Sequence, residues 1–311
     1  MKKRRFIYSA LHHIYQKGEE GFIVFYSDLD FIVFITIFMS VSGKYGIIIL
    51  AFCPMVEHFH AALSCPSKEK LSGFLQESTS KYALEYNDSL HREKGRIFPV
   101  RFGCAPKRDA KAARSLIAYV NNNAPERKLC QKAEDYRWNM LAYARSSHPF
   151  SDPIVLSKCS KRMRRSINLI KGIHSGGGYL GYKTLESLFK CLTDKEKDQL
   201  IDFILHLYCV IDFEEACKLF GDYESMLLAL KTTKGKDFEL KEEWTGYSDK
   251  DYKEMKRLLD RVLTLDDPKK IQLLPEEKRR ALFEYLNGYP PRGKDVAGFL
   301  LIEVFRKNTC R

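Results

Sequence analysis

The chain has 311 residues, of which 45% are hydrophobic and 30% are charged, so it is long enough for roughly two folded domains and is neither disordered nor fibrous in composition. Its formal net charge of +12 favours a polyanionic partner, with nucleic acid ahead of a membrane surface. The nine cysteines form no CxxC pair, which argues against a zinc ribbon or a disulfide framework and favours reduced thiols in a cytosol.

The N-terminal segment and the most apolar region both lack the features of membrane targeting. The opening MKKRRF is basic, but no apolar run and small-residue cleavage site follow it directly, so we expect no secretory signal. The apolar region from Phe31 to Cys53 is interrupted by the polar and glycine-containing residues 40–46. Each remaining piece is shorter than the ~20 residues that a membrane span needs, so we expect a buried helix followed by a buried strand.

The first half of the chain alternates strand and helix signals. Residues 11–16 and 21–27 are rich in β-branched and aromatic residues around a polar turn, which predicts two paired strands. The further elements expected here are a helix from Asp28 or Asp30 to about Val41, strands over 45–53 and 58–64, a helix over 67–87, a loop over 92–109 and a helix over 110–122. Two antiparallel strand pairs with intervening helices predict an α+β fold with helices on one face of the sheet.

Helical patterns dominate the second half of the chain. They cover residues 184–192, 194–209, 212–219, 223–232 and 249–264. Ahead of them come a dense basic run over 158–166 and a glycine-rich stretch over 175–182, which we interpret as a hinge because it lacks the Gly-Lys-Ser/Thr ending of a phosphate loop.

These signals predict three regions of the chain. They are a domain over 1–148, a basic, glycine-rich linker over 149–180 and a helical accessory domain over 181–311. In the accessory domain, residues 275–305 are compatible with a helix-turn-helix and equally with a plain helical hairpin.

The stretch VEHFHAAL, residues 56–63, contains two closely spaced histidines. On a strand, side chains at i and i+2 share one face, so His58 and His60 would project together while Phe59 packs into the core. That spacing suits the binding of one ion through an imidazole nitrogen of each histidine, although a further ligand is needed. The alternative, one packed histidine and one solvated, stays open at this point.

A second pair of interest lies in AYVNNNAP, residues 118–125. Tyr119 and Asn123 are four apart and so share one side of a helix. A tyrosine phenolate is a nucleophile toward phosphorus, and an asparagine carbonyl oxygen is a ligand for a hard divalent ion. The alternative is a core tyrosine followed by an asparagine that caps the helix before Pro125. Tyr82 and Tyr86, the rival nucleophiles, have no amide four positions on and are predicted to be core residues of their helix.

Both pairs belong to one known pattern. The first domain resembles the single-tyrosine transposases of the HUH endonuclease superfamily, specifically the REP-associated tyrosine transposases. In that family a strand carries histidine, a bulky hydrophobe and histidine, as here at 58–60, and a helix carries a tyrosine four residues before an amide, as here at Tyr119 and Asn123. The other segments that agree in order and spacing are HHIYQKG (12–18), AFCPM (51–55), GRIFPVRF (95–102) and EDYRWNMLAY (134–143).

The resemblance implies a fold and a reaction. The implied fold is an RRM-like, ferredoxin-like antiparallel sheet with the histidines on a central strand and the tyrosine on a helix across from it. A divalent ion, Mg²⁺ or Mn²⁺, would be bound by His58, His60 and Asn123. Tyr119 would attack a scissile phosphate, leaving a 5′-phosphotyrosine and a free 3′-hydroxyl, with no nucleotide or other small-molecule cofactor.

The implied partner is single-stranded or hairpin DNA, bound by a monomer or homodimer in the bacterial cytoplasm at the nucleoid, with no membrane involved. DNA binding needs basic side chains for phosphates and aromatic faces for unstacked bases. Phe98 is the predicted stacking face. The predicted phosphate contacts are Arg96, Arg101, Lys107, Arg108, Lys111 and Arg114 near the tyrosine helix, and Lys161, Arg162, Arg164 and Arg165 in the basic run.

Two departures from the family pattern leave a second function open. Val56-Glu57 stands where relatives usually have Pro-Asn, and Ala124 separates Asn123 from Pro125. A catalytically silent DNA-binding or regulatory descendant of such a transposase is therefore the alternative. An RNA-binding protein is disfavoured because no RNP-type aromatic strand occurs.

Overall fold

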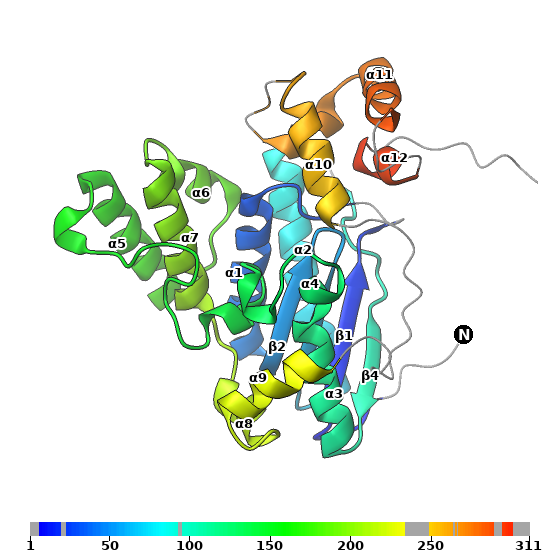
Figure 1. Cartoon of the computed structure of the whole chain (residues 1–311), viewed down its shortest axis with the longest axis vertical. Helices are drawn as coiled ribbons and strands as arrows, with labels where there is room; N and C mark the ends of the chain where they lie inside the picture. The colour runs from blue at the N-terminus through cyan, green and yellow to red at the C-terminus, as the bar shows by residue number, and fades with distance from the viewer. Residues whose placement is uncertain are drawn as a thin grey trace, which may run out of the picture.

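The chain is described here by a computed structural model, which covers residues 6–19, 23–92, 95–233, 249–263, 265, 267–288 and 294–300. A four-stranded antiparallel sheet lies at its centre, with the spatial order β2-β3-β1-β4 (Figure 1). The strands are β1 (Leu11–Lys17), β2 (Ile48–Met55), β3 (His58–Ser64) and β4 (Gly103–Lys107). β3 and β1 are therefore the central strands, and β3 carries the two histidines.

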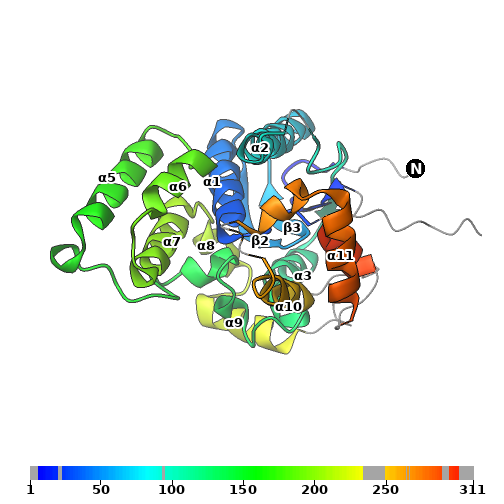
Figure 2. The same cartoon turned by 90° about the horizontal axis from the view of Figure 1, so that it is seen from above.

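Helices cover both faces of the sheet. On one face lie α1 (Asp28–Lys44) and α2 (Lys68–Ser89), and on the other lies α3 (Ala110–Asn121) (Figures 1 and 2). The prediction of helices on one face alone is wrong because α3 also has an apolar side, which it buries against β2 and β3.

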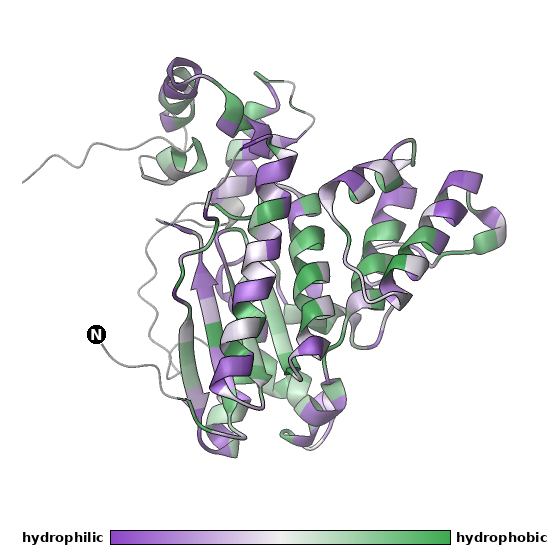
Figure 3. Cartoon of the chain, turned by 180° about the vertical axis from the view of Figure 1, so that it is seen from behind, coloured by the Kyte–Doolittle hydropathy of each residue, from purple (hydrophilic) through white to green (hydrophobic). Residues whose placement is uncertain are grey.

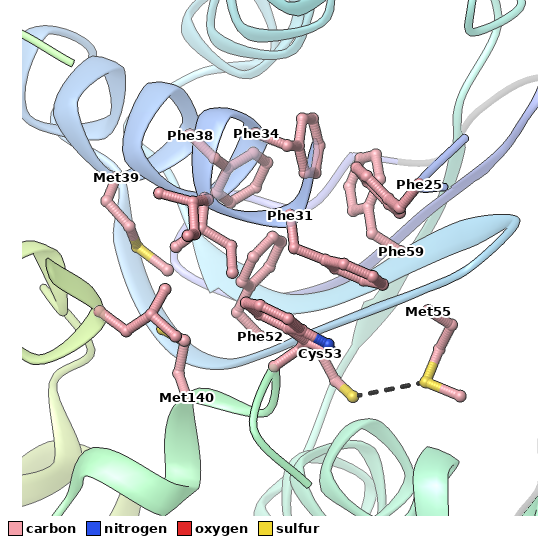
Figure 4. Packing of buried hydrophobic residues seen from close by; sticks show 14 of the residues in the cluster. Phe25, Phe31, Phe34, Phe38, Met39, Phe52, Cys53, Met55, Phe59 and Met140 are labelled. Atoms are coloured by element: carbon pink, nitrogen blue, oxygen red, sulfur yellow. Dashed lines mark hydrogen bonds between the residues drawn. The ribbon is translucent and has the colours of Figure 1, made fainter. Parts of the chain in front are cut away.

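The core is an aromatic layer between α1 and the sheet. The ring of Phe38 stacks on that of Phe52 with centroids 4.4 Å apart, and Phe34 packs against Phe59 at 5.2 Å (Figure 4). Helix α1 is hydrophobic almost all round, whereas α2 has a hydrophilic outer side (Figure 3). A helix of the first kind is stable in water only when it is buried on all sides.

The buried helix α1 is the one predicted from the apolar region that starts at Phe31. Its N-terminus is held by the carboxylate of Asp30, which accepts hydrogen bonds from the backbone N–H groups of Tyr26 and Ser27. Within the described parts of the chain, no helix is both long and apolar enough to cross a bilayer.

Two segments of the sheet domain differ from the sequence prediction. Residues 23–27 do not form a strand, although residues 23–26 are buried. The N–H groups of Val24 and Phe25 both donate to the carbonyl of Val56 instead. Conversely, β4 lies inside the predicted loop over 92–109. Its Pro106 is tolerated because β4 is an edge strand, which needs backbone donors on one side only.

The second half of the chain is helical, as predicted. Its elements are α4 (Asn123–Glu126), η2 (Ala133–Asp135), η3 (Met140–Tyr143), η4 (Leu156–Lys158), α5 (Lys161–Ser175), α6 (Tyr182–Phe189), α7 (Asp194–Tyr208), α8 (Phe213–Lys218), α9 (Tyr223–Thr232), α10 (Asp249–Leu259), η6 (Pro268–Leu273), α11 (Glu276–Asn287) and α12 (Lys294–Leu300). The predicted linker over 149–180 contains helix α5, which packs on α6 and α7, and these two in turn pack on α1 (Figure 1).

The predicted helix-turn-helix over 275–305 is described only in part. Helices α11 and α12 contact each other, whereas residues 289–293 and 301–305 lie outside the described residues. Phe299 of α12 is fully buried, and its carbonyl accepts a hydrogen bond from the hydroxyl of Tyr26. Helix α12 is therefore docked against Tyr26, two residues before α1 begins, and the choice between a helix-turn-helix and a hairpin stays a prediction.

Candidate functional site

The two histidines lie together on the face of β3 that α3 covers. Their side chains are fully buried, and the ring centroids are 4.7 Å apart. Phe59 points to the opposite face, where its ring packs on Phe34 and Phe38. The alternation predicted from the strand is thus confirmed, and the alternative of one solvated histidine is wrong.

Tyr119 lies across from the histidines on α3. Its half-buried ring meets the ring of His60 edge-on, with centroids 5.2 Å apart, and meets the ring of His13 in the same way at 5.4 Å. Asp109 caps the N-terminus of helix α3, and its carboxylate accepts a hydrogen bond from the N–H of Ala112. The fold therefore brings Tyr119, His58 and His60 together from α3 and β3.

A third histidine completes this cluster, and the sequence analysis did not identify it. His13 lies on β1 next to β3, and its Nε2 is 2.9 Å from Nδ1 of His60, so one ring donates a hydrogen bond to the other. Leu11, His13, Tyr15 and Lys17 alternate onto the histidine face, a period-two signal that is readable in the sequence. It was missed because β1 was expected to pair with residues 21–27, whereas it pairs with β3 and β4.

An ion pair lies beside His58. Oε1 of Glu57 is 3.6 Å from Nδ1 of His58 and 3.5 Å from Nη1 of Arg127, and both charged side chains are almost fully buried. Glu57 is one of the residues that depart from the family pattern, and Arg127 was given no role. The pairing links the start of β3 to the residue that follows α4.

Asn123 is the first residue of α4. Helix α3 ends at Asn121, and Asn122 is the cap residue shared by the two helices. The backbone bond from Asn122 to Ala118 and that from Glu126 to Asn122 keep the helical course, so Tyr119 and Asn123 lie on consecutive turns. Asn123 is buried, and Asn122 is fixed by donating its side-chain amide to the carbonyl of Leu230.

The buried histidines are neutral at pH 7. Burial lowers the pKa of His13 to about 3 and that of His58 to about 4, with the positive charge of Arg127 adding to the effect at His58. The pKa of His60 lies well below its usual value, also because of burial. A neutral imidazole keeps the lone pair that metal binding or proton acceptance requires.

The carboxyl group of Glu57 is ionised, in contrast to its neutral neighbours. Burial on its own would raise the pKa of Glu57, but the contact with His58 and the positive charges of Arg127 and Lys17 outweigh it, and the pKa is lowered. The cluster therefore holds one fixed negative charge and one fixed positive charge beside three neutral rings.

The two ring nitrogens of His58 lack hydrogen-bond partners among the described residues. Both of its ring nitrogens are buried, and neither makes a hydrogen bond within the described part of the chain. A buried polar atom without a hydrogen-bond partner lowers the free energy of unfolding by roughly 1–3 kcal/mol. No group of three or more His, Cys, Asp and Glu side chains with the arrangement of a metal site occurs in the residues described.

The predicted DNA contacts near the tyrosine helix divide by exposure. Arg96, Arg101, Arg108, Lys111 and Arg114 are exposed, and Lys107 is half-buried on β4. Phe98, in contrast, is only 6% exposed, with its ring packed against those of Phe34 and Phe59. The prediction that Phe98 stacks on a base is therefore wrong, because its ring is part of the core.

Residues 161–166 of the basic run form the first turns of α5, and Lys158 ends the short helix η4. Lys161, Arg164 and Arg165 are exposed, whereas Arg162 is half-buried and donates to the carbonyl of Ser187. Met163 and Ile167 hold α5 against its neighbours. Since α5 lies on the outer side of α6 and α7, away from the sheet, its basic face is separated from Tyr119 (Figures 1 and 2).

Comparison with known proteins gives one finding. A scan against protein-family models and a search of curated proteins found no match. Among solved structures, the chain is similar to one described as a REP-associated tyrosine transposase bound to a REP hairpin. The two share 14% sequence identity at a TM-score of 0.39, over 46% of this chain and 82% of the other.

Proposed function

We propose that the protein is a metal-dependent single-stranded DNA endonuclease and strand transferase that forms a 5′-phosphotyrosine through Tyr119. The observation that carries this proposal is the half-buried ring of Tyr119 lying edge-on over His60 and His13, with His58 adjacent. The element order β1-α1-β2-β3-α2-β4 supports a ferredoxin-like, RRM-like core with the histidines on a central strand.

In the proposed reaction the nucleophile is the phenol of Tyr119, whose ring lies beside the neutral imidazoles of His13 and His60. The Oη of Tyr119 attacks phosphorus in line and loses its proton to solvent. The P–O3′ bond breaks, and the 3′ oxygen takes up a proton to become a hydroxyl. The phosphotyrosine retains the energy of the broken bond for a later religation, so no nucleotide cofactor is required.

His58 and His60, with Asn123, would hold the divalent ion, and their neutral state suits that role. When bound, the ion supplies positive charge that polarises the scissile phosphate. Two imidazoles favour Mn²⁺ at least as much as Mg²⁺, since magnesium prefers oxygen ligands. His13 would orient His60 through the bond between their rings, as hydrogen-bonded neighbours of metal-binding histidines do.

The DNA partner is supported by charge. The chain has a net charge of +12, and the segment from Arg96 to Arg114 itself carries exposed arginines and a lysine. A single-stranded or hairpin substrate suits the site because a duplex would hide the scissile strand from a half-buried tyrosine. As part of the same proposal, the protein acts as a monomer or homodimer at the nucleoid, in the cytoplasm of a bacterium.

The test is a covalent capture assay. The full-length protein is incubated with a 3′-labelled single-stranded hairpin in Mn²⁺ or Mg²⁺, and adducts are separated under denaturing conditions. We expect a labelled adduct with the wild type and none with Tyr119→Phe or with a chelator. DNA binding without an adduct, across hairpins from the flanks of the gene, would reject the endonuclease.

The second candidate is the silent DNA-binding or regulatory descendant. The observation that favours it is the guanidinium of Arg127 near His58, since a fixed positive charge opposes the binding of a cation. The two candidates differ in metal binding. For the enzyme, Mn²⁺ titration by calorimetry shows saturable binding that His58→Ala abolishes and that Leu228→Ala, on the exposed side of α9, leaves unchanged. Wild-type protein that takes up no Mn²⁺ would favour the silent descendant.

A further inference from the structure

Lys17 lies at one end of the histidine cluster. It is the last residue of β1, and in the register of the sheet it is the direct partner of His58, whereas Tyr15 is the partner of His60. Directly opposed residues of neighbouring strands point to the same face of a sheet. Lys17 and His58 therefore share the face that α3 covers, and Lys17 is half-buried there.

The positive charge of Lys17 acts on the neighbouring side chains. Burial is the main cause of the lowered pKa values of His58 and His60, and the charge of Lys17 contributes to both. Burial on its own would raise the pKa of Glu57, and Lys17 is among the positive charges that lower it. Lys17 is thus close enough to stabilise a negative charge that develops beside His58.

Lys17 differs from its cationic neighbour Arg127 in what it binds. The guanidinium of Arg127 lies 3.5 Å from the carboxylate of Glu57, whereas Lys17 forms no ion pair within the described ranges of the chain. A lysine ammonium has three N–H donors and no acceptor, and a guanidinium does not release its proton in proteins. Of the two cations, Lys17 is therefore the one that can give a proton to an oxygen of the substrate.

Tyr119 lies toward the other end of the cluster. Its ring meets the rings of His13 and His60 edge-on. His13 and Lys17 are four residues apart on β1, which places their Cα atoms about 13 Å apart along the strand. Tyr119 and Lys17 therefore approach the histidines of β3 from opposite ends.

This arrangement matches the geometry of displacement at phosphorus, in which the attacking and leaving oxygens lie roughly in line on opposite sides. We infer that Lys17 is the general acid that protonates the leaving 3′ oxygen when Tyr119 attacks a phosphate lying over the histidines of β3. As the P–O3′ bond breaks, an N–H of Lys17 passes its proton to the 3′ oxygen, which leaves as a hydroxyl, and solvent returns a proton to the amine. The inference rests on the proposed function and adds to it the source of this proton.

A sulfur substitution in the DNA isolates this step. The full-length protein is incubated with the 3′-labelled hairpin, which carries either oxygen or sulfur as the 3′ bridging atom of the scissile phosphate, and the rate of adduct formation is measured. Thiols are far stronger acids than alcohols, so a 3′ thiolate leaves without a proton donor. Loss of a general acid therefore slows the reaction of the oxygen substrate alone.

The variants separate proton donation from other roles of the side chain. Lys17→Met is expected to form the adduct about 100-fold more slowly than the wild type with the oxygen substrate, and at the wild-type rate with the sulfur substrate. Lys197→Met, at a half-buried lysine on α7, is the matched control and should equal the wild type with both. Lys17→Gln, which keeps a polar side chain, carries the same test if Lys17→Met does not fold.

The wild type distinguishes failure of this inference from failure of the proposed function. Equal slowing of a folded Lys17 variant with both substrates overturns the inference, because Lys17 then acts in binding or positioning. Wild-type rates of the variant with both substrates also overturn it and leave the endonuclease in place. A wild-type protein that forms no adduct with either substrate rejects the endonuclease and the role of Lys17 with it.

Discussion

At the scale of single residues, the cluster between β3, β1 and α3 consists of three neutral imidazoles and one phenol. Nε2 of His13 and Nδ1 of His60 share a hydrogen bond, which fixes the ring of His60. His58 has no such internal bond in the described chain. The two histidines of β3 are thus unequal: the ring of His60 is oriented by His13, whereas that of His58 lies beside the carboxylate of Glu57.

Part of this cluster could be predicted from the sequence. The HxH spacing on a strand and the tyrosine-amide spacing on a helix are local patterns, and the structure places His58, His60 and Tyr119 together. His13 and Arg127 could not be found in this way, because their positions depend on which strand lies beside β3 and on the course of the chain after α4.

Gly103 gives a test of the packing around Tyr15. A Cβ atom at Gly103 would lie 2.0 Å from Cε1 of Tyr15, so Gly103→Ala has to push the Tyr15 ring aside. We expect a loss of about 1–3 kcal/mol in the free energy of unfolding, measured by urea denaturation. Gly172→Ala in α5, where a Cβ meets nothing within 4 Å, is the control and should be neutral or stabilising. Equal stability of the two variants would contradict this account of Gly103.

At the scale of elements, helices were easier to predict than strand pairing. Helices α1, α2, α3, α6, α7, α8, α9 and α10 all lie where the apolar spacing placed them, because a helix is set by contacts within one segment. The segment 23–27 has the composition of a strand, yet the N–H groups of Val24 and Phe25 donate to the turn at Val56. The strand β4 has a glycine and a proline in five residues and gives almost no strand signal, and its place is set by pairing with β1.

The element scale also explains where the basic residues lie. The exposed arginines that precede Tyr119 belong to the segment before β4 and to the start of α3, whereas the basic run belongs to α5 on the outside of the helical half. If α5 contacts DNA, it does so at a distance from the tyrosine. The order of residues along the chain gives no measure of that separation.

At the scale of the whole molecule, a buried ionic cluster ties the C-terminal part to α1. Nζ of Lys269 lies 3.3 Å from Oδ1 of Asp30 and 3.2 Å from Oδ2 of Asp267, and 3.3 Å from the ring centroid of Tyr182. Tyr182 also donates its hydroxyl hydrogen to Asp30. Three distant segments, α1, α6 and η6, therefore meet at one lysine that is 1% exposed.

Removing that lysine should destabilise the fold strongly. Lys269→Met leaves the carboxylate of Asp30 buried without its cation, and breaking a buried pair in this way costs about 3–5 kcal/mol. Lys218→Met, which removes exposed ion pairs with Glu214 and Glu215, is the matched control and should change little. Urea denaturation measures both. A Lys269→Met protein as stable as the control would mean that the cluster does not hold the C-terminal part in place.

The most direct test of the central claim is to find which tyrosine carries the DNA. The denaturant-resistant adduct would be digested with protease and nuclease, and the peptide that bears the nucleotide identified by mass spectrometry. The account predicts a nucleotide on Tyr119 alone. A nucleotide on Tyr15 instead, whose ring centroid lies 6.1 Å from that of His60, would contradict the assignment of Tyr119 as the nucleophile.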